Sequence, residues 1–165
     1  CAHLNLQAVR GQVSIMAATS VSAALRTNLC YGGYITAAFE GQHVLGSTFQ
    51  HWLSDTSVRD EDHLYVQNLL HQITGPIFSP QDIIGGRAGF RVTTPDRLPV
   101  IGDMPLGQQS PRPTYISGAH GSHGLISSYL GGLYLAEQIT GGPCTLPAAA
   151  RAAVNPRRFA MKGPL

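Results

Sequence analysis

The sequence has 165 residues, of which 43% are hydrophobic and 12% are charged. This excludes an intrinsically disordered chain, because there is enough apolar material for a core and too little charge to keep the chain open. Eleven Lys and Arg residues against nine Asp and Glu leave the chain nearly neutral, so its composition does not require a nucleic-acid partner.

The three cysteines, Cys1, Cys30 and Cys144, are widely spaced and form neither a zinc-binding nor a disulfide pattern. A reducing cytoplasm is therefore the expected location. No stretch is long and apolar enough to span a membrane, and no signal peptide is visible. The chain begins without Met and lacks a Gly-x-Gly-x-x-Gly after a strand, the usual dinucleotide phosphate-binding motif. We therefore expect a piece of a longer protein.

The first fifty residues predict an antiparallel meander. Strand patterns cover residues 4–19, 25–33, 34–36 and 43–48, with an interruption expected at Arg10-Gly11-Gln12. A helix follows, with Ser57 as its expected N-cap and Gly75 at its end. The apolar face of this helix contains Val66, Leu69, Leu70 and Ile73.

Residues 86–102 predict a strand, a tight turn and a second short strand. Gly86 and Gly89 have no Cβ and allow another backbone or a flat ligand to come close. Pro95 presets φ for a turn, and Asp96 can accept a hydrogen bond from the backbone just ahead.

Arg91 lies on the first of these strands and has two interpretations. Its planar guanidinium suits a substrate carboxylate, and it equally suits a surface ion pair with Asp96 or Asp103. Tyr31 and Tyr34 flank two glycines. They either close a substrate pocket or pack as ordinary aromatic residues of a sheet.

The last third predicts a polar loop over 106–113, a strand over 114–117, a glycine loop over 118–124 and a helix that ends at Gly141. Free N–H groups at a helix start stabilise negative charge, such as that of the N1–C2=O edge of a reduced flavin. The Gly-x-x-Gly-x-x-Gly spacing is explained as well by an ordinary strand-to-helix turn. Gly131-Gly132 inside the helix indicates close packing. An apolar stripe runs along the helix through Leu125, Ile126, Tyr129, Leu130, Leu133, Ala136 and Ile139.

The two histidines of this loop could form a metal or proton-transfer site. His120 and His123 have no evident third ligand, so we expect no metal site and foresee loop hydrogen bonding, with proton transfer as the alternative. A short Ala-rich helix over 146–154 follows. After Glu137 every charged side chain is basic, and this end either touches phosphate or forms a solvated tail.

Six segments together resemble the flavin amine oxidases of the D-amino-acid oxidase and glycine oxidase superfamily. Within it they are most similar to the C-terminal oxidoreductase module of the bifunctional enzymes that make 5-methylaminomethyl-2-thiouridine in tRNA. Residues 91–102 resemble that module's Arg-x-Ala-Thr-x-Asp-x-Leu-Pro-x-x-Gly, and residues 121–125 its Gly-Ser-Arg-Gly-Leu, from which His123 departs. The other similar segments are residues 11–14, 30–36, 43–49 and 153–158.

The resemblance implies an α+β fold, in which the antiparallel sheet of a substrate domain and its flanking helices form part of a two-domain FAD fold. Residues 1–113 would form the substrate-domain sheet with one covering helix. Residues 114–165 would form the strand, loop and helix that return to the FAD domain. The N-terminal FAD-binding half of that fold is missing from this sequence.

The resemblance also implies a function. It implies non-covalent FAD and oxidation of the C–N bond in the carboxymethylaminomethyl side chain of the wobble uridine of tRNA, with a fused methyltransferase domain as a further partner. By likeness, Arg91 binds the substrate carboxylate and Tyr34 forms a pocket wall. The flavin would be held by the backbone of Gly118, Gly121, Ser122, His123, Gly124 and Leu125.

Two other functions fit the same residues. One is an FAD-dependent oxidase of a free small amine such as glycine, sarcosine or a D-amino acid. The other is a non-catalytic domain that binds a carboxylate. Because the FAD-binding half is missing, we expect the chain by itself not to bind FAD tightly and to be inactive.

Overall fold

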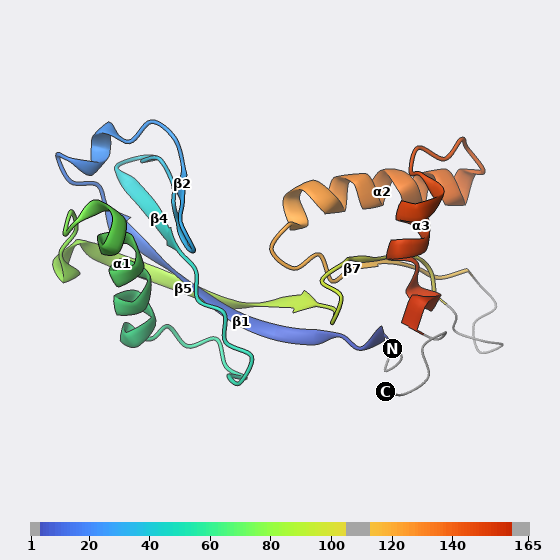
Figure 1. The fold of residues 1–165 in the computed structure, drawn as a ribbon, viewed down its shortest axis with the longest axis horizontal. Helices are drawn as coiled ribbons and strands as arrows, with labels where there is room; N and C mark the ends of the chain where they lie inside the picture. Colours follow the sequence, from blue (N-terminus) through green and yellow to red (C-terminus); the bar gives the residue numbers. More distant parts are fainter. Residues whose placement is uncertain (1–3, 105–112, 160–165) are drawn as a thin grey trace. The chain divides into compact units, whose positions relative to one another are not determined.

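The computed structural model describes residues 4–104 and 113–159. The chain forms two compact units, one made of Val9–Phe90 and the other of Cys1–Ala8 with Arg91–Leu165. Two strands, β1 (Gln7–Ala17) and β5 (Ile83–Thr93), carry the chain from one unit to the other (Figure 1). The division expected at residues 113–114 separates substrate-facing from cofactor-facing parts, and it stays a prediction.

The Val9–Phe90 unit contains a five-stranded sheet in the order β2–β3–β4–β1–β5. The pairs β2–β3, β3–β4 and β4–β1 are antiparallel, which confirms the predicted meander. The strand predicted within 25–33, ahead of a turn at Gly32-Gly33, has only two residues, and a 3₁₀ turn, Ser22–Ala24, precedes it. The further elements are β2 (Leu29–Cys30), β3 (Tyr34–Ile35), β4 (Gln42–Gly46) and α1 (Asp60–Thr74).

Helix α1 packs against this sheet through one face. Val66 and Leu70 are fully buried in a cluster with sheet residues, as predicted, whereas Ile73 is 57% exposed. The helix begins at Asp60 with Arg59 as its N-cap, so the prediction of Ser57 as N-cap was wrong. The cluster beneath the helix consists of Met16, Ile35, Leu45, Val66, Leu70 and Phe78.

Strand β1 is continuous, and the interruption predicted at Arg10-Gly11-Gln12 was wrong. Side chains of a strand alternate between its two faces, so Arg10, Gln12, Ser14 and Met16 share one face. All four are buried. The polar residues therefore face inward on this strand, where they find partners on other segments.

Gly86 is placed where no side chain fits. A Cβ at this position would lie 2.5 Å from Cε1 of His63 and 3.0 Å from the carbonyl oxygen of Val13. This confirms the predicted close approach of another backbone. A Cβ at Gly89, on the same strand, would meet nothing within 4 Å among the described residues.

We expect Gly86→Ala to destabilise the protein by about 1–3 kcal/mol, because His63 and strand β1 must move apart to admit the methyl group. Gly89→Ala is the matched control and should change the free energy of unfolding much less. Urea-induced unfolding of the two variants checks this. Equal midpoints for Gly86→Ala and Gly89→Ala would contradict the geometry.

The second unit contains a two-stranded antiparallel sheet of β6 (Val100–Asp103) and β7 (Tyr115–Gly118), in which Val100 lies opposite Gly118. Strand β5, the turn after Thr93 and strand β6 confirm the strand, turn and strand predicted over 86–102. The predicted loop at 106–113 lies, except for its last residue, outside the described residues. The helices of this unit are α2 (Gly124–Thr140), α3 (Ala148–Val154) and a 3₁₀ turn, Pro156–Phe159.

Helix α2 packs against β6 and β7 through the face that contains Gly131. Gly131 is buried, and a Cβ there would lie 2.9 Å from Cδ1 of Ile101 and 3.0 Å from Oγ of Ser117. Close packing is thus confirmed at Gly131, while Gly132 has open space beside it among the described residues. The predicted apolar stripe is present but exposed; its large residues are Leu125, Ile126, Tyr129, Leu130, Leu133 and Ile139.

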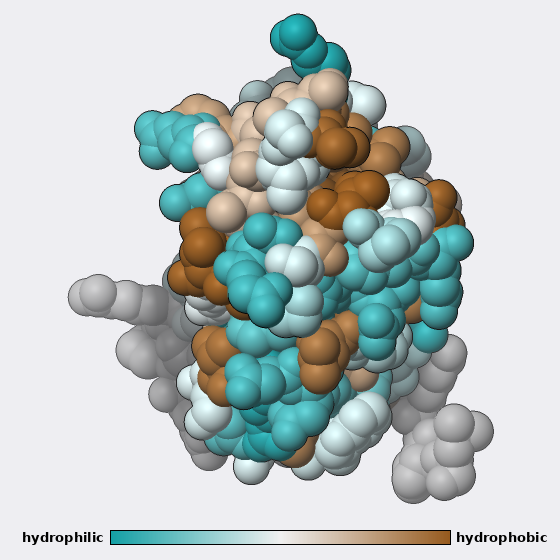
Figure 2. Space-filling model, turned by 90° about the vertical axis from the view of Figure 1, so that its left-hand side faces the viewer, coloured by the Kyte–Doolittle hydropathy of each residue, from teal (hydrophilic) through white to brown (hydrophobic). Residues whose placement is uncertain are grey.

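Figure 2 looks onto the face formed by the Val9–Phe90 unit, where hydrophobic side chains form separate areas between hydrophilic ones. Exposed aromatic residues of this unit include Phe39 and Trp52. Scattered exposed apolar residues of this kind are normal on protein surfaces. In the described part of the chain, no helix has the length and apolarity needed to cross a membrane.

Candidate active site

The predicted carboxylate-binding residue, Arg91, lies near the end of β5 and is half-buried. The strand ends at Thr93, and the following turn is closed by a hydrogen bond from Arg97 N–H to the Thr94 carbonyl at 3.0 Å. Asp96 Oδ1 accepts from Leu98 N–H at 3.1 Å, which confirms the predicted bond to the backbone ahead.

The two acids considered as partners of Arg91 both pair with arginines near the chain's end. Asp96 pairs with Arg158 at 2.8 Å, and Asp103 pairs with Arg157 at 2.5 Å. The hydrogen bond from Arg158 is the main reason why the pKa of Asp96 lies well below its ordinary value. Two charges of the basic end are thus neutralised within the chain, which weakens its case as a phosphate-binding surface.

The glycine loop joins the strand of Arg91. Gly121 N–H donates to the carbonyl of Val92 at 3.1 Å, and Gly121 has a φ of 56° that favours glycine. Residues 118–125, predicted to hold a flavin, are therefore hydrogen-bonded to the neighbour of Arg91. The same structural unit contains both features.

The start of α2 offers backbone donors. Among the described residues, no acceptor faces the N–H groups of Ser122, Gly124 and Leu125. Leu125 is 96% exposed, so nothing in the described chain covers this end of the helix. Unpaired N–H groups at the positive end of a helix dipole stabilise an anion, and these residues therefore fit the negative edge of a reduced flavin.

His120 fixes the shape of this loop. Ser127 Oγ donates to the His123 carbonyl at 2.8 Å, so it accepts from His120 Nδ1–H, also at 2.8 Å. His120 Nε2 then accepts from Ser117 Oγ at 3.1 Å. The neutral imidazole satisfies every bond in this series and connects the end of β7 with the first turn of α2.

Burial lowers the pKa of His120 below its ordinary value of 6.5. As pH falls, the unfolded chain binds the proton first, so the stabilisation is complete above about pH 6.5 and is lost below it. His120→Gln should therefore flatten the decline of the urea midpoint below pH 6.5. The control His123→Gln keeps the Ser117–His120–Ser127 bonds and should keep the decline. An unchanged pH dependence in His120→Gln would contradict this assignment.

Tyr34, the predicted pocket wall, lies in the Val9–Phe90 unit and is half-buried. Its ring lies against Gly46 of β4, where a Cβ would come within 2.9 Å of the ring and its hydroxyl. Tyr31 packs against the core, and burial raises its pKa to about 12. Its hydroxyl has no partner among the described residues. Tyr31 thus serves as a core aromatic, and the role of Tyr34 toward substrate stays a prediction.

A cleft of about 620 Å³ opens between α1 and residues 76–82. Neither Arg91 nor Tyr34 lines it. His71 Nε2 on its wall is buried without a partner among the described residues. None of the predicted site residues contributes to this cleft, so it is separate from the candidate active site.

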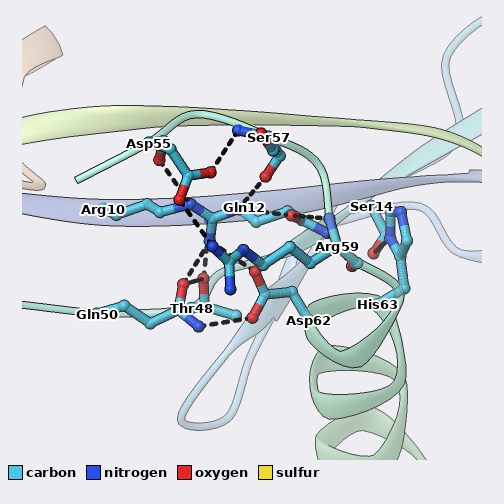
Figure 3. Close-up of polar contacts among 10 residues, drawn as sticks. All are labelled: Arg10, Gln12, Ser14, Thr48, Gln50, Asp55, Ser57, Arg59, Asp62 and His63. Carbon is cyan, nitrogen blue, oxygen red and sulfur yellow. Dashed lines mark hydrogen bonds and ion pairs between the residues drawn. The ribbon is translucent and has the colours of Figure 1, made fainter. Parts of the chain in front are cut away.

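Sequence reasoning missed a buried polar cluster in the Val9–Phe90 unit (Figure 3). The guanidinium of Arg10 pairs with Asp62 at 2.6 Å, with both side chains almost entirely buried. Arg10 also donates to the backbone carbonyls of Asp55 and Ser57, ahead of α1. The side chain of Gln12 accepts from Arg59 N–H at 2.8 Å and donates to the Arg59 carbonyl at 2.7 Å, which fixes Arg59 rather than Ser57 as the residue directly ahead of the helix. The cluster also contains Gln12, Ser14, Thr48, Gln50, Arg59 and His63.

In the part of the chain that the structure describes, no side chains are arranged as a metal site or joined as a disulfide. There, no three His, Cys, Asp or Glu side chains come together as metal ligands. Cys30 and Cys144 are exposed free thiols, and Cys1 lies outside the described residues.

Solved structures share this fold. Glycine oxidase from Geobacillus kaustophilus superposes with a TM-score of 0.75, at 19% identity, over 92% of this chain and 39% of that chain. L-proline dehydrogenase from P. horikoshii superposes with a TM-score of 0.74, at 21% identity, over 95% of this chain and 41% of that one. These likenesses confirm the predicted α+β fold of the glycine oxidase type.

Sequence comparison gives the family. The family DAO, described as FAD dependent oxidoreductase, matches residues 2–138. The chain therefore belongs to the DAO family of FAD-dependent oxidoreductases, as its resemblance predicted.

Two relatives carry the name tRNA 5-methylaminomethyl-2-thiouridine biosynthesis bifunctional protein MnmC. The one from Chromobacterium violaceum is 35% identical over 97% of this chain, and the one from Pseudomonas syringae pv. tomato is 33% identical over 98%. The chain spans 28% and 29% of their respective lengths.

Proposed function

We propose that this chain is part of a longer FAD-dependent oxidoreductase that oxidises the C–N bond of the carboxymethylaminomethyl side chain of wobble uridine in tRNA. The observation that supports this most is the hydrogen bond from Gly121 N–H to Val92, because it joins the glycine loop to the strand of Arg91. A reacting substrate must meet both a carboxylate-binding group and the cofactor. The names of the relatives supply the tRNA substrate.

In this proposal Arg91 binds the carboxylate of the substrate's carboxymethyl group. A guanidinium offers two parallel N–H donors that match a carboxylate and fix its orientation. Orientation matters because the CH₂ between the carboxylate and the amine loses a hydride, and hydrolysis of the resulting imine releases glyoxylate. The aminomethyl group then remains on the uridine.

The bound flavin supplies the hydride-accepting chemistry. Residues 118–125 would hold it, because Gly118, Gly121 and Gly124 carry no Cβ that would keep a flat ring away from the backbone. The N–H groups of Ser122, Gly124 and Leu125, for which no acceptor is found among the described residues, would stabilise the flavin edge that becomes negative on reduction. His123 departs from the Arg of the Gly-Ser-Arg-Gly-Leu pattern that residues 121–125 resemble, so this chain lacks a permanent charge there.

The remaining length of the protein supplies the FAD-binding half, which covers the exposed apolar face of α2. That face contains six large hydrophobic residues, more than an isolated surface helix normally leaves in water. A fused methyltransferase domain and a cytoplasmic location belong to the same proposal. The chain alone then binds FAD weakly and has no activity.

The second candidate is oxidation of a free small amine. The solved structures with this fold include glycine oxidase and an iminodiacetate oxidase from Chelativorans sp. BNC1, which superposes with a TM-score of 0.71. Arg91 suits the carboxylate of such amines equally well. The substrate itself therefore has to separate the two candidates.

The deciding experiment uses the complete gene product, purified with its flavin and mixed anaerobically with candidate substrates. Bleaching of the flavin absorbance by tRNA that carries carboxymethylaminomethyl-uridine, but not by glycine or sarcosine, is the expected result. Bleaching by glycine or sarcosine would move the assignment to a free-amine oxidase. A colourless protein would overturn both proposals and leave a non-catalytic carboxylate-binding domain.

A further inference from the structure

Arg158, near the end of the described chain, donates hydrogen bonds to three other residues. Its Nε and Nη2 donate to the two carboxylate oxygens of Asp96 at 2.8 and 3.1 Å. Nη2 also donates to the Leu98 carbonyl at 2.9 Å, and Nη1 to the Asn155 carbonyl at 3.3 Å. The guanidinium lies 4.2 Å from the centre of the Phe159 ring. Only 11% of this side chain is exposed.

The contacts of Arg158 to Asp96 and Leu98 are contacts with the turn that follows β5. Thr94 Oγ1 lies 2.8 Å from Asp96 Oδ1 and 2.7 Å from the Leu98 carbonyl, and Asp96 Oδ1 accepts from Leu98 N–H. Arg97 has a φ of 59°, in the left-handed region that a non-glycine residue rarely adopts. Arg158 contacts both Asp96 and Leu98, so it holds the turn in this conformation from outside.

The turn begins directly after the end of β5. This end of the strand contains Arg91, the proposed carboxylate-binding residue, and Val92, which is bonded to the proposed flavin-binding loop. Arg91 is three residues ahead of Thr94, and the Val92 carbonyl between them accepts the bond from Gly121. We therefore expect a shift of the turn to reach Arg91, because only two residues of backbone separate them. Misplacement of a binding group by about 1 Å can lower a rate about 100-fold.

We propose that Arg158 is a positioning residue, which through Asp96 and the turn 94–98 holds Arg91 in place to bind a substrate carboxylate. This rests on the proposed function of Arg91. The inference assigns to the C-terminal 3₁₀ turn, Pro156–Phe159, a part in substrate binding although Arg158 itself contacts no substrate.

The neighbouring Arg157 is a matched control. It lies in the same 3₁₀ turn and forms an ion pair with Asp103, but its side chain is 57% exposed, and Asp103 belongs to β6. Replacing either arginine removes one positive charge and one ion pair from the same segment. Only the replacement of Arg158 removes a contact to the turn after β5.

The experiment uses the complete, flavin-loaded gene product and glycolate as a probe, because glycolate has the carboxylate and carbon spacing of a carboxymethyl group. Binding is followed by the change in the visible spectrum of the flavin. Arg158→Ala should weaken glycolate binding about 10- to 100-fold, while Arg157→Ala should keep it within about twofold. Arg158→Lys restores the charge without the paired donors and should recover binding in part.

The outcomes separate the inference from the proposed function. If Arg91→Ala leaves glycolate binding unchanged, the proposed role of Arg91 fails and the inference fails with it. If Arg91→Ala abolishes binding but Arg158→Ala and Arg157→Ala behave alike, only the inference fails. A purely structural role would reduce the flavin-loaded fraction of Arg158→Ala and leave the affinity of that fraction unchanged. If Arg158→Ala does not fold, Asp96→Asn replaces it, with weaker glycolate binding expected.

Discussion

Arg91→Ala is expected to lower kcat/KM for flavin reduction by a carboxylate-bearing amine by a factor of roughly 10 to 150. This corresponds to about 1.5–3 kcal/mol for hydrogen bonds to a charged group, at about 1.4 kcal/mol for each factor of ten. The loss should appear in KM, because the carboxylate is already bound in the ground state, and also in kcat, because Arg91 orients the CH₂ that loses the hydride. Stopped-flow measurement of flavin bleaching at several substrate concentrations checks both expectations.

Two further variants sharpen this result. Arg91→Lys keeps the charge but not the paired donors, so its KM should lie between those of the unchanged protein and of Arg91→Ala. Arg87→Ala removes an exposed arginine from the same strand and should leave the kinetics nearly unchanged. If Arg87→Ala and Arg91→Ala had equal effects, the strand's charge rather than a specific carboxylate contact would explain them.

Asp62→Ala is expected to produce the largest loss of stability, about 3–5 kcal/mol, because it leaves the buried guanidinium of Arg10 without its counter-ion. Arg10 would keep its bonds to backbone carbonyls, but its charge would be unpaired away from water. Hydrogen–deuterium exchange in the complete protein should show faster exchange in β1 and α1, since Arg10 lies on β1 and Asp62 on α1.

Asp55→Asn is the control for this prediction. Asp55 pairs with Arg59 at 2.7 Å, and both side chains are more than one third exposed. Water solvates both charges after the pair is broken, so the loss of stability should be much smaller than for Asp62→Ala. Similar protection from exchange in the two variants would mean that the Arg10–Asp62 pair does not stabilise the unit.

Local patterns predicted much of the fold correctly. The turn at Pro95 and Asp96, the glycine loop and the helix that ends at Gly141 each depend on residues close in sequence. Their backbone preferences act within a few residues and can be read directly. The family resemblance added the expected cofactor and the proposed role of Arg91, which no local pattern determines.

The long-range pairs could not be predicted in this way. Arg10 and Asp62 are 52 residues apart, and Arg158 and Asp96 are 62 apart. Each residue alone resembles an ordinary surface charge, so a sequence pattern gives no reason to bury it. One signal was available: Arg10 alternates with Gln12, Ser14 and Met16, and a buried Met at that period indicates that the polar residues share its face.

The two junctions between the compact units have a consequence for how such enzymes diversify. The chain passes between the units only at residues 8–9 and 90–91, on β1 and β5, which are neighbours in one sheet. Residues 9–90 therefore have two adjacent ends, the arrangement in which the insertion of a domain is tolerated. Recombination at two points can replace the unit that contains Tyr34 and leave intact the one that contains Arg91 and the glycine loop.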